Sequence, residues 1–139
     1  MLLTIEKVII LKSINLFSEI SENDLLAMAM QLREIQYEEN SVVFKQGDLG
    51  TSLYIIATGE VEVIMNDKVI SILGEKNIFG ELAALDPEPR SATIRTTKST
   101  LLFQVDSVVM YNLIAEYGDV ARGIIKILCQ RVRQNSVSI

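Results

Sequence analysis

The sequence contains no histidine and a single cysteine, and these shortages exclude most of the common catalytic and metal chemistries. Without histidine there is no Ser-His-Asp triad, no Cys-His pair and no histidine-based zinc or iron site. The single cysteine, Cys129, cannot form an internal disulfide, and its apolar helical context predicts a buried structural thiol. We therefore expect a cytoplasmic chain without a metal or a cofactor, in which only carboxylate chemistry stays open.

Basic residues are also scarce, because 13 Lys and Arg stand against 18 Asp and Glu and leave a net charge of -5. Binding to nucleic acid without sequence preference depends on clustered Lys and Arg, so no nucleic-acid partner is expected. One basic group lies on the last predicted helix, at Arg122, Lys126, Arg131 and Arg133. Cations there also suit the helix dipole. The apolar N-terminal residues are interrupted by Glu6, Lys7 and Lys12, which argues against a signal peptide and against membrane insertion.

A length of 139 residues, a hydrophobic content of 49% and only 2 Pro and 7 Gly are typical of one globular domain, assigned to residues 1–139. Residues 1–32 are predicted to form an N-terminal helical subdomain, with one helix over 4–11 and another that Ser21 caps and that ends near Leu32. Residues 107–139 return to the helical period after Asp106, a predicted N-cap. A break at Tyr117-Gly118 separates two C-terminal helices.

Between these helices, over residues 33–106, the apolar period is two, which is typical of strands. Strands are predicted at 33–38, 42–45, 52–57, 60–65, 68–73, 91–96 and 100–105. Asn66-Asp67 predicts a tight hairpin, since both residues tolerate positive φ. Many short antiparallel strands at this spacing indicate a sandwich or barrel, and we predict a mainly β fold, an antiparallel jelly-roll-like β-barrel with flanking helices.

The segment "IFGELAALDPEPRSATIR" interrupts the strand pattern with residue types suited to an anion. Gly80 precedes a short helical turn, whose free N–H groups can receive an anion, and lets the backbone approach a ligand. Arg90 adds a fixed positive charge with a fork geometry suited to phosphate. Glu81 would repel a lone phosphate but can accept a hydrogen bond from a hydroxyl. A phosphate beside a sugar hydroxyl, as in a ribonucleotide, satisfies both residues.

Two motifs then carry a resemblance to a known family. "FKQGDLGTSLYIIATGEVEV" and "FGELAALDPEPRSATI" resemble the Gly-bearing turn and the phosphate-binding cassette of cyclic nucleotide-binding domains, as in cAMP-dependent kinase regulatory subunits, cyclic nucleotide-gated channels and catabolite-activator-type regulators. The resemblance covers nearly the whole chain. Two separated motifs in the right order are more specific than one Gly-rich match.

The resemblance implies a role for each residue of the cassette, 79–92. Arg90 would pair with the exocyclic phosphate oxygens, and Glu81 would accept the ribose 2′-hydroxyl. The backbone N–H groups that complete the cradle would be those of Leu82, Ala83 and Ala92. Ser91, where Thr tends to accompany cGMP preference, favours cAMP. The base side of the pocket would be lined by Val63, Ile70, Ser71 and Leu73, with the last helix, including Leu128, as a lid.

The resulting prediction is a non-catalytic cAMP sensor that couples ligand binding to movement of its C-terminal helices. Asp86 and Glu88 put negative charge near the anion and predict weaker affinity. In one alternative, Arg90 pairs with Glu81 and the chain is a ligand-free interaction module. The apolar surface of its last helix, wider than one stripe, would then contact a second copy or a neighbouring effector domain. A cupin-type enzyme is disfavoured because cupins usually hold a metal through histidines.

Overall fold

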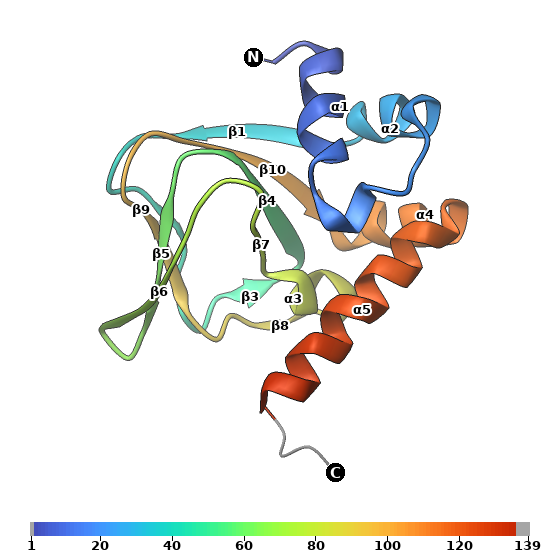
Figure 1. Ribbon diagram of the computed structural model, residues 1–139. Helices are drawn as coiled ribbons and strands as arrows, with labels where there is room; N and C mark the ends of the chain where they lie inside the picture. Colours follow the sequence, from blue (N-terminus) through green and yellow to red (C-terminus); the bar gives the residue numbers. More distant parts are fainter. Residues whose placement is uncertain (1, 136–139) are drawn as a thin grey trace. The chain divides into compact units, whose positions relative to one another are not determined.

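Ten strands form two four-stranded antiparallel sheets and one short strand pair in the computed structural model, which describes residues 2–135 (Figure 1). Sheet A has the order β1 (Arg33–Tyr37), β10 (Thr100–Asp106), β4 (Ser52–Thr58) and β7 (Ile78–Phe79). Sheet B has the order β2 (Val42–Phe44), β9 (Thr93–Thr96), β5 (Val61–Met65) and β6 (Lys68–Leu73). The pair consists of β3 (Leu49–Gly50) and β8 (Glu88–Pro89). The strands belong to one compact unit, residues 31–110, called here the β unit.

The core of the β unit is built from both sheets. Its buried cluster comprises Tyr54, Ile56, Val61, Phe79, Ile94 and Leu102. The central strand β4 is buried at six consecutive positions, as expected for a strand with both faces covered. Burial of these apolar side chains stabilises the unit by roughly 1.5–3 kcal/mol for each large residue.

The predicted mainly β fold with flanking helices is confirmed, and all seven predicted strands are present within one or two residues of their expected ends. Within residues 2–135 the strand pairings form two four-stranded sheets and the separate β3–β8 pair, and no ladder joins the two larger sheets into a closed barrel. The predicted hairpin turn is also confirmed, with positive φ at Asn66 and Asp67. Asn40 has a φ of 61°, in the left-handed region that asparagine tolerates.

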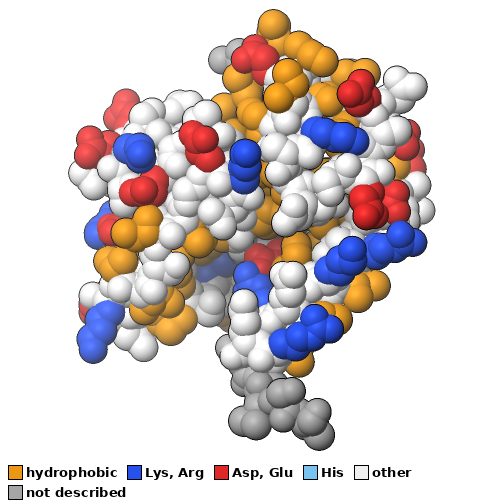
Figure 2. Space-filling view, in the orientation of Figure 1, with side chains coloured by type: hydrophobic (Ala, Val, Ile, Leu, Met, Phe, Trp, Pro, Cys, Tyr) orange, Lys and Arg blue, Asp and Glu red, His pale blue; other side chains and the backbone are white. Residues whose placement is uncertain are grey.

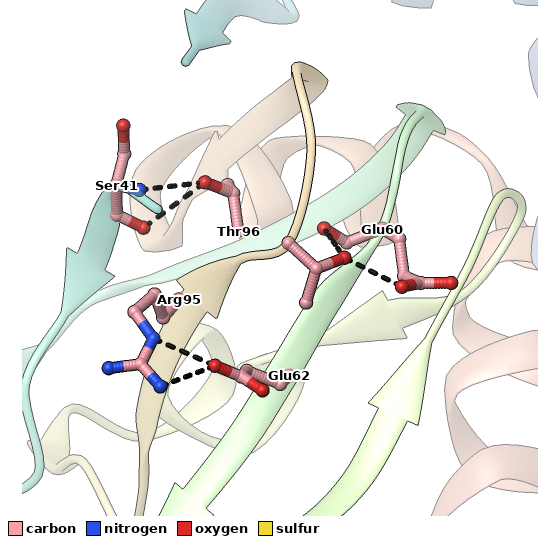
Figure 3. Close-up of polar contacts among 6 residues, drawn as sticks. Ser41, Glu60, Glu62, Arg95 and Thr96 are labelled. Atoms are coloured by element: carbon pink, nitrogen blue, oxygen red, sulfur yellow. Dashed lines mark hydrogen bonds and ion pairs between the residues drawn. The ribbon is translucent and has the colours of Figure 1, made fainter. Parts of the chain in front are cut away.

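Polar contacts on sheet B tie neighbouring strands together (Figure 3). Arg95 Nε of β9 donates to Glu62 Oε1 of β5 at 2.7 Å. Thr96 Oγ1 accepts the Ser41 N–H at 2.8 Å and donates to the Glu38 carbonyl at 2.6 Å. Because Thr96 is fully buried, its hydroxyl fixes the turn before β2 where water cannot substitute for it.

The second unit, residues 2–30 with 111–135, is helical and is called the helical unit. It holds α1 (Thr4–Lys12), the 3-10 turn η1 (Asn15–Phe17), α2 (Glu22–Ala29), most of α4 (Ser107–Glu116) and α5 (Gly118–Asn135). The predicted caps are confirmed: Ser21 Oγ accepts the Asp24 N–H at 3.3 Å, and Asp106 Oδ1 accepts the Val109 N–H at 3.0 Å. None of the helices described is both long and apolar enough to span a bilayer.

Helix α5 packs on η1 at Gly123, where an added Cβ would lie 2.5 Å from Leu16 Cδ1. Val120 and Ile124 are buried, whereas the thiol of Cys129 is exposed, so the prediction of a buried thiol is wrong. Five residues beyond Ile124, Cys129 is turned about 140° around the helix axis. The same exposed side includes Ile125 and Val132, consistent with the predicted wide apolar surface. Figure 2 shows Lys and Arg side chains gathered along α5.

Candidate functional site

The two sequence motifs meet at Arg90. The short strands β3 and β8 pair Leu49 with Pro89, and the Arg90 N–H donates to the Asp48 carbonyl at 2.7 Å. The Gly47 N–H in turn donates to the Arg90 carbonyl at 2.8 Å. The turn at 47–50 therefore fixes the backbone of Arg90, although the two segments are separated by about forty positions.

The Arg90 side chain is buried, with 7% of its surface exposed. Nη2 donates to the Ser52 carbonyl at 2.8 Å and Nη1 donates to the Gly80 carbonyl at 3.4 Å. Cζ lies 4.0 Å from the centroid of the Phe44 ring and 5.9 Å from that of Tyr54. A cation over an aromatic face is attracted by the ring quadrupole, so the Phe44 ring stabilises the guanidinium in this position.

Two glycines make room for this guanidinium. A Cβ at Gly50 would lie 2.6 Å from Arg90 Cζ, and a Cβ at Gly80 would lie 2.6 Å from Arg90 Nη1. Gly80 also has a φ of 77°, a left-handed conformation that side chains rarely adopt. Neither position can take a side chain unless Arg90 moves.

Burial lowers the pKa of the Arg90 guanidinium, while the nearby Tyr54 and Glu88 raise it. The group stays charged at neutral pH because an arginine side chain is not deprotonated in proteins. In the part of the chain that the structure describes, Arg90 forms no ion pair, so the alternative pairing with Glu81 is not observed. The Ser52 and Gly80 carbonyls engage two of the five N–H groups of a guanidinium, which leaves donor capacity for an anion.

Glu81 is the first residue of α3 (Glu81–Leu85), directly after Gly80, and is 3% exposed. Its carboxylate is thus buried beside the loop that holds Arg90. Ala83 is buried and Leu82 is 43% exposed. The first N–H groups of a helix have no acceptor within the helix, which is the property that the sequence prediction assigned to this turn.

The other predicted site residues are more dispersed. After Arg90, Ser91 is exposed and Ala92 is buried. Val63 of β5 and Leu73 of β6 are half-buried against the core cluster. Ser71 faces Val63 across the β5–β6 ladder, and Ile70 is exposed at the irregularity in that ladder. Leu128 is half-buried on α5, in the helical unit.

Sequence reasoning missed three residues that contact Arg90: Phe44, Gly50 and Ser52. All three lie in the first motif, "FKQGDLGTSLYIIATGEVEV", or open it. The motif resembles a Gly-bearing turn, and that resemblance does not reveal that Gly50 lies against a guanidinium. Ser52 contributes its backbone carbonyl, which no residue type encodes.

Among the residues described, no cluster of three or more Cys, Asp or Glu could hold a metal ion. The chemistry of the site is therefore that of a buried cation, a buried carboxylate and backbone amides. Such a set suits binding of a molecule with one anionic group and a hydroxyl.

Comparison with known proteins gives matches along most of the chain. The family model of the cyclic nucleotide-binding domain matches residues 34–117. A CRP-like cAMP-activated global transcriptional regulator of Mycobacterium tuberculosis is 25% identical over 132 residues, which cover 91% of this chain and 59% of that protein. A putative potassium channel protein of Rhodopseudomonas palustris is 36% identical over 123 residues, covering 86% of this chain and 30% of that protein.

A solved structure agrees in fold. The catabolite activator protein of Thermus thermophilus superposes with a TM-score of 0.81 at 26% identity, covering 87% of this chain and 59% of that chain. This chain thus spans less than two thirds of the length of each of these three proteins.

Proposed function

The chain belongs to the cyclic nucleotide-binding domain family, and we propose that it is a non-catalytic sensor of cAMP whose C-terminal helices move when the nucleotide binds. The observation that carries this proposal is the buried Arg90, which two carbonyls and an aromatic ring hold in the cassette without an ion pair. A cyclic phosphate bears one negative charge, which matches one guanidinium.

Each remaining part of the nucleotide has a proposed partner. Glu81, buried directly after Gly80, accepts the ribose 2′-hydroxyl. The amides of Leu82, Ala83 and Ala92 complete the phosphate cradle. Ser91 supports a preference for cAMP over cGMP, through the family resemblance. One relative, the mycobacterial regulator, is described as cAMP-activated.

Isothermal titration with cAMP and cGMP tests the assignment of Arg90. Arg90→Ala removes a charge-assisted contact with phosphate, and we expect a loss of about 1.5–3 kcal/mol in binding free energy, or roughly tenfold to hundredfold in Kd. The matched control is Arg95→Ala, which removes an arginine that is paired with Glu62 on sheet B. Equal cAMP affinity of wild type and Arg90→Ala would refute the site.

Helix movement needs a separate measurement, and Cys129 supplies it. This cysteine is exposed on α5 and is the single cysteine of the sequence, so a fluorophore attached to it reports on that helix alone. Ligand binding can shift a helix only through different affinity for its two positions. We expect the emission spectrum to change on addition of cAMP and to stay constant in Arg90→Ala. A constant spectrum in a protein that binds cAMP would reject the coupling.

A second candidate function is a ligand-free interaction module, favoured by the exposed apolar side chains of α5. Ile125 is 59% exposed and Val132 is 62% exposed. Covering such side chains is favourable by about 25 cal/mol for each Å² removed from water. This function predicts a dimer in gel filtration, lost in Ile125→Gln, and no thermal stabilisation by any cyclic nucleotide. Stabilisation by cAMP would reject it.

A further inference from the structure

A small cavity lies within the β unit, lined by residues of β1, β4 and β10 and by residues next to these strands. Its volume is about 260 Å³, and it is lined by Gln31, Arg33, Thr51, Ser52, Gln104, Asp106 and Val109. Six of these seven residues are polar. None of them is a predicted nucleotide-binding residue, although the backbone carbonyl of Ser52 accepts from Arg90. The cavity is small compared with the roughly 300–1,000 Å³ of sites for drug-sized ligands.

The register of sheet A explains why polar side chains gather there. Arg33 of β1 lies opposite Gln104 of β10, and Asp106 of β10 lies opposite Ser52 of β4. Residues that face each other across a ladder point to the same side of the sheet, and so do residues two apart on one strand. The four side chains therefore share one face over three adjacent strands, while the intervening Val105 belongs to the opposite, apolar face.

Only some of the polar groups on this face form hydrogen bonds with one another. Gln104 Nε2 donates to Ser52 Oγ at 3.2 Å and to the Tyr54 hydroxyl at 3.1 Å. Asp106 Oδ1 accepts the Val109 N–H at 3.0 Å. Over residues 2–135, the Arg33 guanidinium has no side-chain hydrogen bond and no ion pair, and Asp106 is not paired with it. A cation and an anion thus line one small cavity without neutralising each other.

From this arrangement we propose that the cavity binds a small α-amino acid, with its carboxylate on Arg33 and its ammonium group on Asp106. The planar guanidinium suits a carboxylate because two parallel N–H groups can bind its two oxygens. The free Oδ2 of Asp106 can accept from an ammonium group while Oδ1 continues to cap α4. The hydroxyls of Thr51 and Ser52 favour an amino acid whose side chain is small and polar.

The two charges also exclude simpler ligands. An inorganic anion attracted to Arg33 is repelled by Asp106, and a metal cation attracted to Asp106 is repelled by Arg33. A zwitterion is attracted by both groups and adds no net charge to the cavity. This specificity does not depend on the proposed nucleotide function.

Isothermal titration without any nucleotide tests the site, using glycine, L-alanine, L-serine and L-asparagine on the full chain. We expect L-serine or L-asparagine to bind most tightly. L-Serinamide lacks the carboxylate and N-acetyl-L-serine lacks the ammonium group, so each should bind at least roughly tenfold more weakly than L-serine. Equal binding of the three serine compounds, or no binding of any amino acid at millimolar concentration, overturns the proposal.

Variants assign the two charges. Arg33→Gln and Asp106→Asn should each weaken L-serine binding roughly tenfold to hundredfold, since each removes a charge-assisted contact. Asn is as good an N-cap as Asp, so Asp106→Asn keeps α4 intact. Lys98→Gln removes an exposed cation outside the cavity and should leave the affinity unchanged. A loss in Lys98→Gln equal to that in Arg33→Gln would contradict the site, and cAMP affinity, measured separately on the same variants, shows whether the nucleotide site is intact.

Discussion

Gly50→Ala isolates the packing around Arg90 better than any change of Arg90 itself. The φ of Gly50 lies outside the left-handed region, so alanine fits the backbone there. The added Cβ, however, would lie 2.6 Å from Arg90 Cζ and 2.7 Å from Arg90 Cδ, distances that real Cβ contacts do not reach. The guanidinium must therefore leave its place while its charge and chemistry stay unchanged.

The size of the effect follows from the contacts that the guanidinium loses. The bond from Nη2 to the Ser52 carbonyl, at 2.8 Å, is charge-assisted and contributes about 1.5–3 kcal/mol. The contact with the Phe44 ring, at 4.0 Å, contributes about 0.5–2 kcal/mol. Replacing glycine stabilises by about 0.4–1 kcal/mol through the unfolded chain. The net expectation is a loss of roughly 1–5 kcal/mol in the free energy of unfolding.

Urea unfolding measures this loss, and a double-mutant cycle identifies its cause. If Gly50→Ala acts through Arg90, the double variant Gly50→Ala/Arg90→Ala should be about as stable as Arg90→Ala. The double variant should also bind cAMP no more weakly than Arg90→Ala does. Gly74→Ala is the matched control because nothing lies within 4 Å of its added Cβ. Fully additive effects of the two substitutions, or an effect of Gly50→Ala no larger than that of Gly74→Ala, would refute the reasoning.

Two further predictions concern the β unit. Thr96→Val removes the hydroxyl that joins the Glu38 carbonyl to the Ser41 N–H, and leaving these partly buried groups without their partner should cost about 1–3 kcal/mol of unfolding free energy, measured in urea. Burial raises the pKa of the Tyr54 phenol above its ordinary 10.0, against the opposing effects of Arg90 and Gln104. A raised folded-state pKa favours the neutral phenol, so its contribution to stability is complete below pH 10 and is lost as the pH rises through the folded value. Burial also raises the pKa of Tyr37, so Tyr54→Phe should reduce, and not abolish, the late part of the tyrosinate absorbance titration.

Each of these two predictions has a result that would contradict it. Thr96→Ser keeps the hydroxyl, so it should retain most of the stability that Thr96→Val loses; equal losses would show that the methyl group matters instead. For Tyr54, an unchanged late part of the titration in Tyr54→Phe would contradict the raised pKa of its phenol.

The longer strands could be predicted from their apolar residues, which alternate or form short continuous runs between turn residues, whereas the shortest strands could not. β3, β7 and β8 have two residues each, too few for any alternation. The Asn66-Asp67 turn was predictable from residue type. The positive φ of Lys76, 72°, was not predictable, because the Lys76 N–H donates to the Ile56 carbonyl of β4 and this tertiary contact fixes its backbone.

The error at Cys129 has a similar origin. Apolar residues occupy much of the circumference of α5, and the sequence alone does not predict which part of this wide surface is buried against neighbouring elements. Leu16 of η1, more than a hundred residues earlier in the sequence, packs against α5 at Gly123. This contact determines which side of the helix, including Ile124, is buried. Cys129 lies outside that contact and is exposed.

The sequence motif identifies Arg90 but does not predict which groups hold its side chain. The spacing from Gly80 to Arg90 identifies the residues, but the carbonyl of Ser52, 38 positions away, and the Phe44 ring decide how the charge is held. A buried charge without a counter-ion is costly, and neutral carbonyls offset only part of that cost. In the proposed complex the cyclic phosphate would supply that countercharge, so we expect cAMP to raise the free energy of unfolding of the chain. Electrostatics, more than loop shape, would then make this segment an anion site.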